Sequence, residues 1–402
     1  MKTIAVICEY NPLHFGHLYH INQIREHYGE CAVVALLSGD FVQRGEPAVL
    51  TKTARARAAV SAGCDLVFEL PAPYCFASAE HYARAGVKLA ASLGADVLSF
   101  GSESGELAEL QAAAKRLESP AFSAKLDELA KKEPALGIVS ARAAAARESG
   151  LETFSGLITA PNNILALEYI KAVNKLDMKQ LPELHTVRRI GAGYNSLSEN
   201  DGFVSASFIR SKIFAGEEFK NYLPDFTYNM CMESLNDGIF PTSLKRLELP
   251  ILCFFRLADA KKLSEFAESG GGLSYRLCRA AREADSLEAF FEAAATKKYT
   301  NARLRRAVLS CMLGIYESDL RAPPAFTRLL AASANGRSLL NSIRLASDIE
   351  ILTSAADFKK LPQAYERARA LYRTSEALYT LAFQTPRPAS DLIKARPYIA
   401  KN

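Results

Sequence analysis

Two histidines near the start of the chain, His14 and His17, have a spacing that suits joint action on a phosphate group. Three residues is close to one helical turn, so both imidazoles can face the same side and offer N–H donors to a phosphate oxygen. Gly16 lies between them and has no Cβ, which lets a ligand approach the backbone. Such donors suit adenylyl transfer, because negative charge grows on the α-phosphate and on the departing pyrophosphate. The alternative is that the two histidines are surface or capping residues.

The histidines follow what the sequence predicts to be a strand-to-helix corner. A short apolar run, Ile4 to Cys8, has the length of a buried parallel strand, and the dipeptide Asn11-Pro12 that follows it is a turn signal. In a parallel sheet this corner lies at the carboxyl end of the strand, where open α/β folds bind their ligands. The exposed N–H groups of the first helical turn favour an anion there. We therefore expect a phosphate site at this corner.

The first half of the chain alternates short apolar runs with alanine-rich helical stretches, a pattern typical of a doubly wound parallel α/β sheet. The expected strands cover residues 4–8, 31–37, 66–70, 97–100 and 184–187, and helices between them cover about 14–27, 51–62 and 77–93. Polar loops follow two of these strands, at 38–45 and 101–105. Ordinary βα turns also favour glycine and serine, so a binding role and a plain turn both stay open for these loops.

The segment around the histidines resembles the HxGH signature of the nucleotidylyltransferase superfamily. Longer strings, at residues 9–20, 38–48, 100–103 and 161–165, resemble those of the bacterial tRNA(Met) cytidine acetate ligase family. The resemblance runs from the first predicted strand through most of the chain, so it is more specific than a lone HxGH motif. It implies a nucleotidylyltransferase-like Rossmann domain that binds ATP.

A second string with phosphate chemistry runs from Val204 to Arg210. It resembles the superfamily's ISxTxIR element, in which hydroxyls at a helix N-terminus and an arginine on the next turn hold the β- and γ-phosphates. This chain departs from the pattern with Val204 for isoleucine and Ser207 for threonine, and Ser207 retains the hydroxyl. Ser205 is a suitable N-cap by type, so a plain capped helix is the alternative.

Three more residues are candidates for contact with the nucleotide. Arg188 and Arg189 follow a predicted strand, where guanidinium groups suit a triphosphate, although adjacent arginines are often plain surface charge. Asn162 opens a predicted helix that it could simply cap, whereas the resemblance implies that it reaches the nucleotide. With His14 and His17 as catalytic residues, the resemblance implies an ATP site made of Ile7, Cys8, Glu9, Tyr10, Asn11, Pro12, Gly16, His20, Gly101, Asn162, Arg188, Arg189, Ser207 and Arg210.

The length of the chain and a change in its residue pattern after residue 223 predict two domains. A chain of 402 residues exceeds what one core usually serves. Residues 1–223 form the expected ATP and acetate domain, and residues 224–402, which lack short β-branched runs, form the expected all-helical domain. Within the latter, residues 297–306 carry five basic side chains, a tyrosine and no acid, so a solvated helix face or an RNA contact fits. The resemblance favours tRNA binding by Lys297, Lys298, Tyr299, Arg303, Arg305 and Arg306.

The composition of the chain limits its class, its partners and its location. A net charge of +5 permits a nucleic-acid partner without proving one, and 49% hydrophobic residues are ordinary for a globular protein. Eight cysteines form no CxxC pair and no zinc-like spacing, so we expect reduced thiols and no protein metal site. The sequence contains no stretch typical of a signal peptide or a membrane span, which predicts a cytoplasmic protein without a membrane partner. Nothing in the composition predicts the oligomeric state.

The resemblance implies a reaction in two steps. Acetate would attack the α-phosphate of ATP to give acetyl-adenylate, and the N4 amine of the wobble cytidine of elongator tRNA(Met) would then take the acetyl group. Mg²⁺ is implied by ATP, but its ligands and the residues of the second step cannot be identified from the sequence. Two rivals use the same nucleotide site: an adenylyltransferase or synthetase acting on a small metabolite, and a nucleotide- or RNA-binding module without catalysis.

Overall fold

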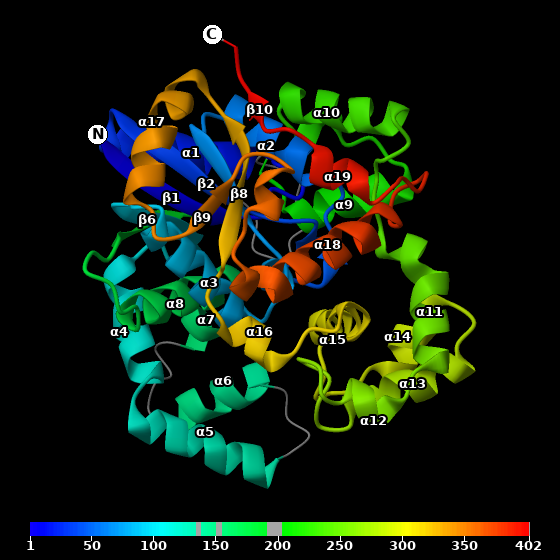
Figure 1. Cartoon of the computed structure of the whole chain (residues 1–402). Coiled ribbons are helices and arrows are strands. Elements are labelled where there is room, and N and C mark those ends of the chain that lie inside the picture. Colours follow the sequence, from blue (N-terminus) through cyan, green and yellow to red (C-terminus); the bar gives the residue numbers. More distant parts are fainter. Residues whose placement is uncertain (134–137, 150–154, 191–202, 402) are drawn as a thin grey trace.

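The computed structural model describes residues 1–401 except 134–137, 150–154 and 191–202. One sheet lies at its centre, with the strand order β10-β8-β5-β2-β1-β6-β7 and β9 beside β8 (Figure 1). All neighbouring strands in it are parallel except β5 and β8. The strands span β1 Lys2–Cys8, β2 Cys31–Ser38, β5 Leu66–Leu70, β6 Val97–Ser102, β7 Glu183–Arg188, β8 Phe326–Ala332, β9 Glu350–Leu352 and β10 Tyr398–Ile399. The predicted doubly wound α/β fold is confirmed.

Alternate residues of β1 face two helical layers. Ile4 and Val6 pack with Ile21 and Ile24 of α1, which spans Phe15–Tyr28. Ala5 faces the opposite layer, which includes α3, Ala79–Ser92, and α8, Pro161–Asn174. Burial on both faces explains why these strands read as continuous apolar runs in the sequence.

The helices of the first half follow the predicted order. Between strands lie α2 Lys52–Ser61, α4 Leu107–Leu117, α5 Pro120–Lys132, α6 Ile138–Glu148 and α7 Ser155–Thr159, and a short hairpin joins β3 Phe41–Val42 to β4 Glu46–Pro47. Each βα crossover brings the chain back to the same edge of the sheet, so the carboxyl ends of β1, β2, β6 and β7 lie together. This edge is where sequence reasoning expects the ligand.

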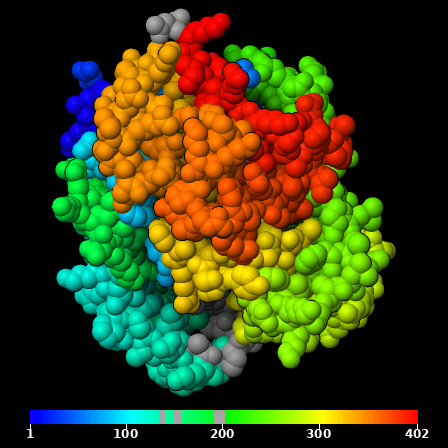
Figure 2. Space-filling view, in the orientation of Figure 1, coloured from blue at the N-terminus to red at the C-terminus, as the bar shows by residue number. Residues whose placement is uncertain are grey.

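The second half is helical from residue 206 to residue 321. Its helices are α9 Ala206–Ala215, α10 Asp225–Asn236, α11 Glu248–Leu257, α12 Ala260–Leu263, α13 Leu273–Glu283, α14 Leu287–Ala294, α15 Asn301–Leu313 and α16 Glu317–Arg321. Helices α11 to α15 group beside the sheet at the lower right of Figure 1. In Figure 2 the orange and red residues that follow them cover the centre of the visible face.

The expectation that residues 224–402 are all-helical is wrong for three strands. After α16 the chain returns to the central sheet, where β8 pairs antiparallel with β5, and β9 and β10 each pair with β8. Helices α17 Ala334–Ala346, α18 Glu366–Thr380 and α19 Ser390–Lys394 accompany them. All seven residues of β8 are buried, although its sequence, Phe-Thr-Arg-Leu-Leu-Ala-Ala, contains one β-branched residue and a charge. The sheet contains strands from both sides of residue 223. The division into two domains at that residue stays a prediction.

The thiols and the hydropathy of the helices agree with the sequence analysis. All cysteines are free, and Cys253 is the exposed one. No helix among the described residues is both long and apolar enough to cross a lipid bilayer.

Candidate active site

A cavity of about 500 Å³ opens at the carboxyl ends of β1, β6 and β7. This volume lies in the range typical of sites for small molecules and cofactors. Its lining includes twelve of the predicted residues, namely Ile7, Cys8, Glu9, Tyr10, His14, Gly16, His17, His20, Gly101, Asn162, Arg188 and Arg189. The sheet edge that was expected to bind phosphate is therefore hollow, and residues from four separate segments meet there.

His14 and His17 cap the helix α1 and also line this cavity. Nδ1 of His14 accepts the backbone N–H of Gly16 at 3.0 Å, and Nδ1 of His17 accepts the backbone N–H of His14 at 3.3 Å. The ring centroids lie 3.9 Å apart, so the two imidazoles do face the same side. Capping and ligand binding were alternatives in the sequence, and the geometry combines them in the same two rings.

These hydrogen bonds determine the tautomer of both rings. Because Nδ1 accepts in each case, the hydrogen of the neutral ring is on Nε2, which is left as a donor toward the cavity. Burial lowers the pKa of His14 to about 3, helped by the charges of Arg189 and Arg210. Burial also lowers the pKa of His17 well below its usual value, helped by His14 and Arg189. Both imidazoles are thus neutral N–H donors at physiological pH in the unliganded protein.

Gly16 and His20 support the histidine pair. A Cβ on residue 16 would lie 2.9 Å from Cε1 of His14, so the glycine makes room for the capping ring itself. Nε2 of His20 lies 2.9 Å from the Ser99 hydroxyl, which also meets His185 of β7 at 3.0 Å. His20 therefore ties α1 to β6 and β7, and burial lowers its pKa to about 3.

Two arginines supply the positive charge of the cavity. Arg188 ends β7, and the backbone N–H of Arg189 donates to the carbonyl of Ser102 at 2.9 Å. The Arg189 side chain lies across Gly101, where a Cβ would meet its Cγ at 3.4 Å. Partial burial lowers the pKa of Arg189 below its usual value, while Glu103 opposes this shift. The Arg189 side chain is still exposed to solvent, so its positive charge is accessible to an anion that binds in the cavity.

Asn162 is held in place by Glu103, a residue that sequence reasoning did not assign to the site. Oε1 of Glu103 accepts the backbone N–H and the side-chain amide of Asn162, at 3.1 and 2.7 Å. Its Oε2 accepts the backbone N–H of Asn163 at 2.7 Å. Glu103 thus caps α8, and the Asn162 side chain is not the cap. The string Phe-Gly-Ser-Glu after a predicted strand was the signal that could have identified it.

Four residues predicted for the ATP site do not line the cavity, whereas Ser205 of the second phosphate string does. Ser205 caps α9 by accepting the N–H of Phe208 at 3.2 Å, as expected, and Ser205 itself lines the cavity. Arg210 donates to the carbonyl of Asn11 at 3.0 Å and lies 3.9 Å from the Glu46 carboxylate. The residues outside the lining are Asn11, Pro12, Ser207 and Arg210.

Aromatic side chains that sequence reasoning missed complete the lining. Tyr82 and Tyr169 are buried, and the Tyr82 hydroxyl meets Ser38 at 3.2 Å. Phe100 packs against Tyr169 with ring centroids 5.7 Å apart. Tyrosines within predicted helices carry no local signal of a ligand, because core positions use the same residue types. Tyr19 and Phe203 belong to the same aromatic group, and the aliphatic Leu165 and Val187 line the cavity as well.

The basic segment at 297–306 is only partly available to a partner. Lys297 and Lys298 are exposed at the surface. Tyr299 is buried, and its hydroxyl donates to the carbonyl of Gly271 at 2.9 Å while the Arg303 guanidinium lies over its ring. Arg305 is paired with Glu46, and Arg306 with Glu268 at 2.8 Å.

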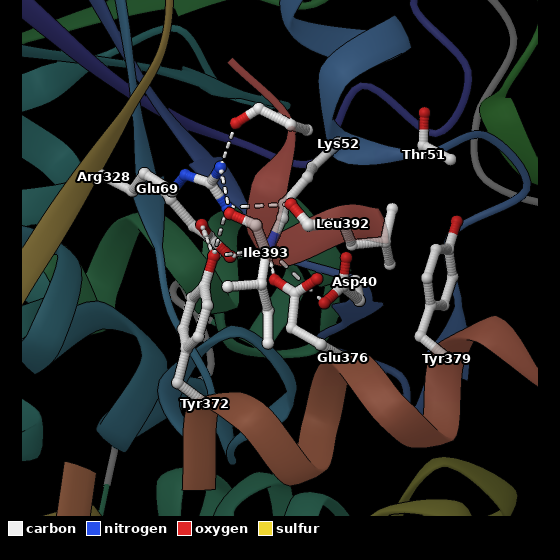
Figure 3. A network of polar contacts seen from close by, with 12 residues as sticks. Asp40, Thr51, Lys52, Glu69, Arg328, Tyr372, Glu376, Tyr379, Leu392 and Ile393 are labelled. Carbon is white, nitrogen blue, oxygen red and sulfur yellow. Dashed lines mark hydrogen bonds and ion pairs between the residues drawn. The ribbon is translucent and has the colours of Figure 1, made fainter. Parts of the chain in front are cut away.

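A second polar cluster lies buried outside the cavity (Figure 3). The ammonium of Lys52 contacts the carboxylates of Glu69 at 2.7 Å, Asp40 at 3.5 Å and Glu376. Three carboxylates this close have the donor set of a cation site. Lys52 already occupies their centre, so a divalent ion would have to displace a buried ammonium. We therefore assign this cluster to the architecture of the protein.

Comparison with known proteins agrees with this geometry. The model of the family described as HIGH Nucleotidyl Transferase matches residues 1–391. The tRNA(Met) cytidine acetate ligase of Caldanaerobacter subterraneus subsp. tengcongensis is 34% identical, with 96% of each chain covered. That of Thermosipho melanesiensis is 35% identical, covering 90% of this chain and 86% of the relative.

Solved structures give the same result. The crystal structure of Thermotoga maritima TmcAL bound with alpha-thio ATP superposes with a TM-score of 0.90 at 28% identity, with 99% of each chain covered. The apo form of that protein superposes with a TM-score of 0.92. The likeness covers the central sheet, the cavity and the C-terminal strands β8, β9 and β10, so it is not confined to the HxGH motif. The chain therefore belongs to the HIGH nucleotidyl transferase family, within the group of the tRNA(Met) cytidine acetate ligases.

Proposed function

We propose that this protein is a tRNA(Met) cytidine acetate ligase that uses ATP to activate acetate. The observation that carries the proposal is the pair of neutral imidazoles at the start of α1, whose Nδ1 atoms are engaged and whose Nε2–H groups are left as donors in a cavity of about 500 Å³. Relatives of that name at 34% identity over 96% of the chain support the choice of substrates.

In the first step an acetate oxygen attacks the α-phosphorus of ATP, and the bond to the β-phosphate oxygen breaks to release pyrophosphate. His14 and His17 donate to the phosphate oxygens on which negative charge grows. Arg188 and Arg189 hold the triphosphate and offset the charge of the leaving group. Ser207 and Arg210 do not line the cavity, and we retain them as proposed contacts to the β- and γ-phosphates.

In the second step the N4 amine of the wobble cytidine of elongator tRNA(Met) attacks the acetyl carbonyl, and AMP leaves. The mixed anhydride is required because acetate itself is a poor acyl donor toward an amine. The exposed Lys297 and Lys298 are the members of the basic segment best available to the RNA backbone. Arg303, Arg305 and Arg306 each pair with a carboxylate of the protein. Both steps are proposed to occur in the cytoplasm, where ATP and tRNA are found.

Magnesium would accompany the phosphates of ATP. Among the described lining residues, Glu9 and Glu103 are the carboxylates, and both oxygens of Glu103 accept hydrogen bonds from Asn162 and Asn163. This donor set does not make a protein-held magnesium site of several carboxylates. We therefore assign no step of the reaction to the metal.

One assay separates this proposal from its rivals. The protein is incubated with ATP, labelled acetate and tRNA(Met), and both pyrophosphate and label in the RNA are followed. Acetate-dependent pyrophosphate release together with label in tRNA is the expected result. Pyrophosphate release that requires a different small carboxylate or metabolite would support an adenylyltransferase or synthetase, and the absence of both products would support a binding module.

A further inference from the structure

One carboxylate in the cavity has no part in the activation step described above. Glu9 follows the last residue of β1, and it is partly buried in the lining near His14 and His17. Its Oε1 accepts the backbone N–H of Gln43 at 2.8 Å, and its own carbonyl accepts a hydrogen bond from Arg55 at 2.7 Å. Within the described residues, Oε2 of Glu9 accepts no hydrogen bond. The side chain is thus fixed by one oxygen and presents the other.

A carboxylate is a poor neighbour for a triphosphate, because the two repel each other. The resemblance implies a place for residue 9 in the ATP site, and a backbone contact there would not require its carboxylate. A carboxylate is, however, the usual acceptor for the N4–H donor of cytosine. Glu103, the other carboxylate among the described lining residues, caps α8, and both of its oxygens accept hydrogen bonds there. Among the described lining residues, Glu9 is therefore the carboxylate with an oxygen available to an amine.

We propose that Glu9 is the catalytic base of the second step and receives the N4 proton of cytidine as the amine attacks the acetyl-adenylate. The inference rests on the proposed function. In this step the C–N bond forms, the bond between the acetyl carbon and the phosphate oxygen breaks, the proton passes to Oε2 of Glu9, and AMP leaves with the electron pair. Solvent later removes the proton from Glu9.

The surroundings of Glu9 suit a group that must accept a proton and then release it. Burial raises its pKa above the usual value, while the Gln43 N–H and the charges of Arg210, Arg44 and Arg55 oppose that rise. A base is most effective when its pKa approaches the working pH. Tyr82 and Tyr169 belong to the same lining and offer aromatic surface to a base that enters there.

The test separates the two half-reactions of one protein. In Glu9→Gln the side chain keeps its size and can still accept from Gln43, but it cannot take a proton. Acetyl transfer to tRNA, measured as a single turnover, should fall about 100-fold. Acetate-dependent exchange of pyrophosphate into ATP should fall less than about threefold, and acetyl-adenylate should accumulate. Glu9→Asp, which retains a carboxylate, should recover part of the transfer rate.

The controls decide between the possible failures. Glu109→Gln, on the exposed side of α4, should leave both half-reactions at the wild-type rate. If wild-type protein gives neither exchange nor labelled tRNA, the proposed function itself is wrong. If wild type is active and Glu9→Gln transfers acetyl at the same rate, Glu9 is not the base. An equal loss of exchange and transfer in Glu9→Gln would place the side chain in ATP binding and would also overturn the proposal.

Discussion

The capping hydrogen bonds of His14 and His17 perform a structural and a chemical task with the same atoms. Each Nδ1 satisfies a backbone N–H in the first turn of α1, and that engagement leaves Nε2–H for the ligand. Because burial lowers the pKa of both rings, the donors stay neutral and add no positive charge to the cavity. The sequence predicted the shared direction of the rings, but a tautomer depends on hydrogen bonds that spacing alone does not define.

Replacing one donor should reduce activation of acetate. His17→Asn should lower acetate-dependent pyrophosphate exchange about 100-fold, the usual loss when one donor to a developing oxyanion is removed. Affinity for tRNA should change little, since His17 lies in the cavity and the basic segment lies at the start of α15 and just before it. His27→Asn is a matched control from the last turn of α1, where the ring packs on His185 outside the lining. Equal losses in both variants would show that the helix as a whole, and not the donor, had been damaged.

At the scale of elements, the hairpin β3–β4 connects the basic helix α15 to the nucleotide site. Glu46 of β4 pairs with Arg305 of α15 and lies 3.9 Å from Arg210 of α9. Gly45 lets the two elements meet, because a Cβ there would lie 2.7 Å from the backbone nitrogen of Arg306. The sequence predicted both the loop at 38–45 and the basic segment, but their contact joins residues far apart in the chain and left no local pattern.

Gly45→Ala should separate this hairpin from α15. The residue has φ +74°, so the substitution adds both backbone strain and the clash with Arg305 and Arg306. We expect a loss of stability of about 2–4 kcal/mol, measured by denaturant unfolding. Gly94→Ala is the matched control, because Gly94 also has φ +74° but no atom lies within 4 Å of its Cβ position. A similar loss in both variants would mean that strain alone, and not the contact, determines the effect.

The surface of the basic segment offers a separate prediction for tRNA. Lys297 and Lys298 are exposed, whereas Arg305 and Arg306 are held by carboxylates of the protein. The double variant Lys297→Ala, Lys298→Ala should weaken tRNA binding and reduce the salt dependence of the affinity by roughly one to two units of slope. Pyrophosphate exchange should be unchanged. Lys261→Ala with Lys262→Ala, an exposed pair on α12, is the control. An unchanged salt slope in the first variant would remove this segment from the interface.

At the scale of the whole molecule, the cluster around Lys52 joins the first and last parts of the chain. Lys52 belongs to α2 and Asp40 to the loop after β2, while Tyr372 and Glu376 belong to α18 (Figure 3). Arg328 of β8 donates to the Tyr372 hydroxyl at 3.2 Å. The parallel strands could be predicted from local apolar runs. The return of β8 could not, because a buried arginine in a strand becomes favourable only when Tyr372 and the carbonyls near α19 are in place.

Three buried carboxyl groups, those of Asp40, Glu69 and Glu376, contact the single ammonium of Lys52, so acidic groups outnumber the ammonium at this point. The ammonium of Lys52 lies nearer to the carboxylates of Glu69 and Glu376 than to Asp40, which is 3.5 Å away. Oδ1 of Asp40 and Oε2 of Glu376 both have no hydrogen-bond partner among the described residues. Burial and the neighbouring Glu376 raise the pKa of Asp40 to about 8. We infer that Asp40 is the member of the cluster that holds a proton at neutral pH, which reduces the excess of negative charge.

The proton on Asp40 makes the stability of the whole molecule depend on pH. The folded protein keeps this proton up to about pH 8, whereas an unfolded aspartate loses it near pH 4, so the folded state binds more protons between these values. The contribution is therefore fully present below about pH 4 and is lost as the pH rises toward 8. Asp40→Asn should stay within about 1 kcal/mol of wild type at pH 6 and become more stable than wild type at pH 9. Lys52→Met, which leaves the carboxyl groups uncompensated, should cost about 3–5 kcal/mol at pH 7. Parallel curves of unfolding free energy against pH for wild type and Asp40→Asn would mean that Asp40 is ionised throughout, and that Lys52 balances the cluster without a bound proton.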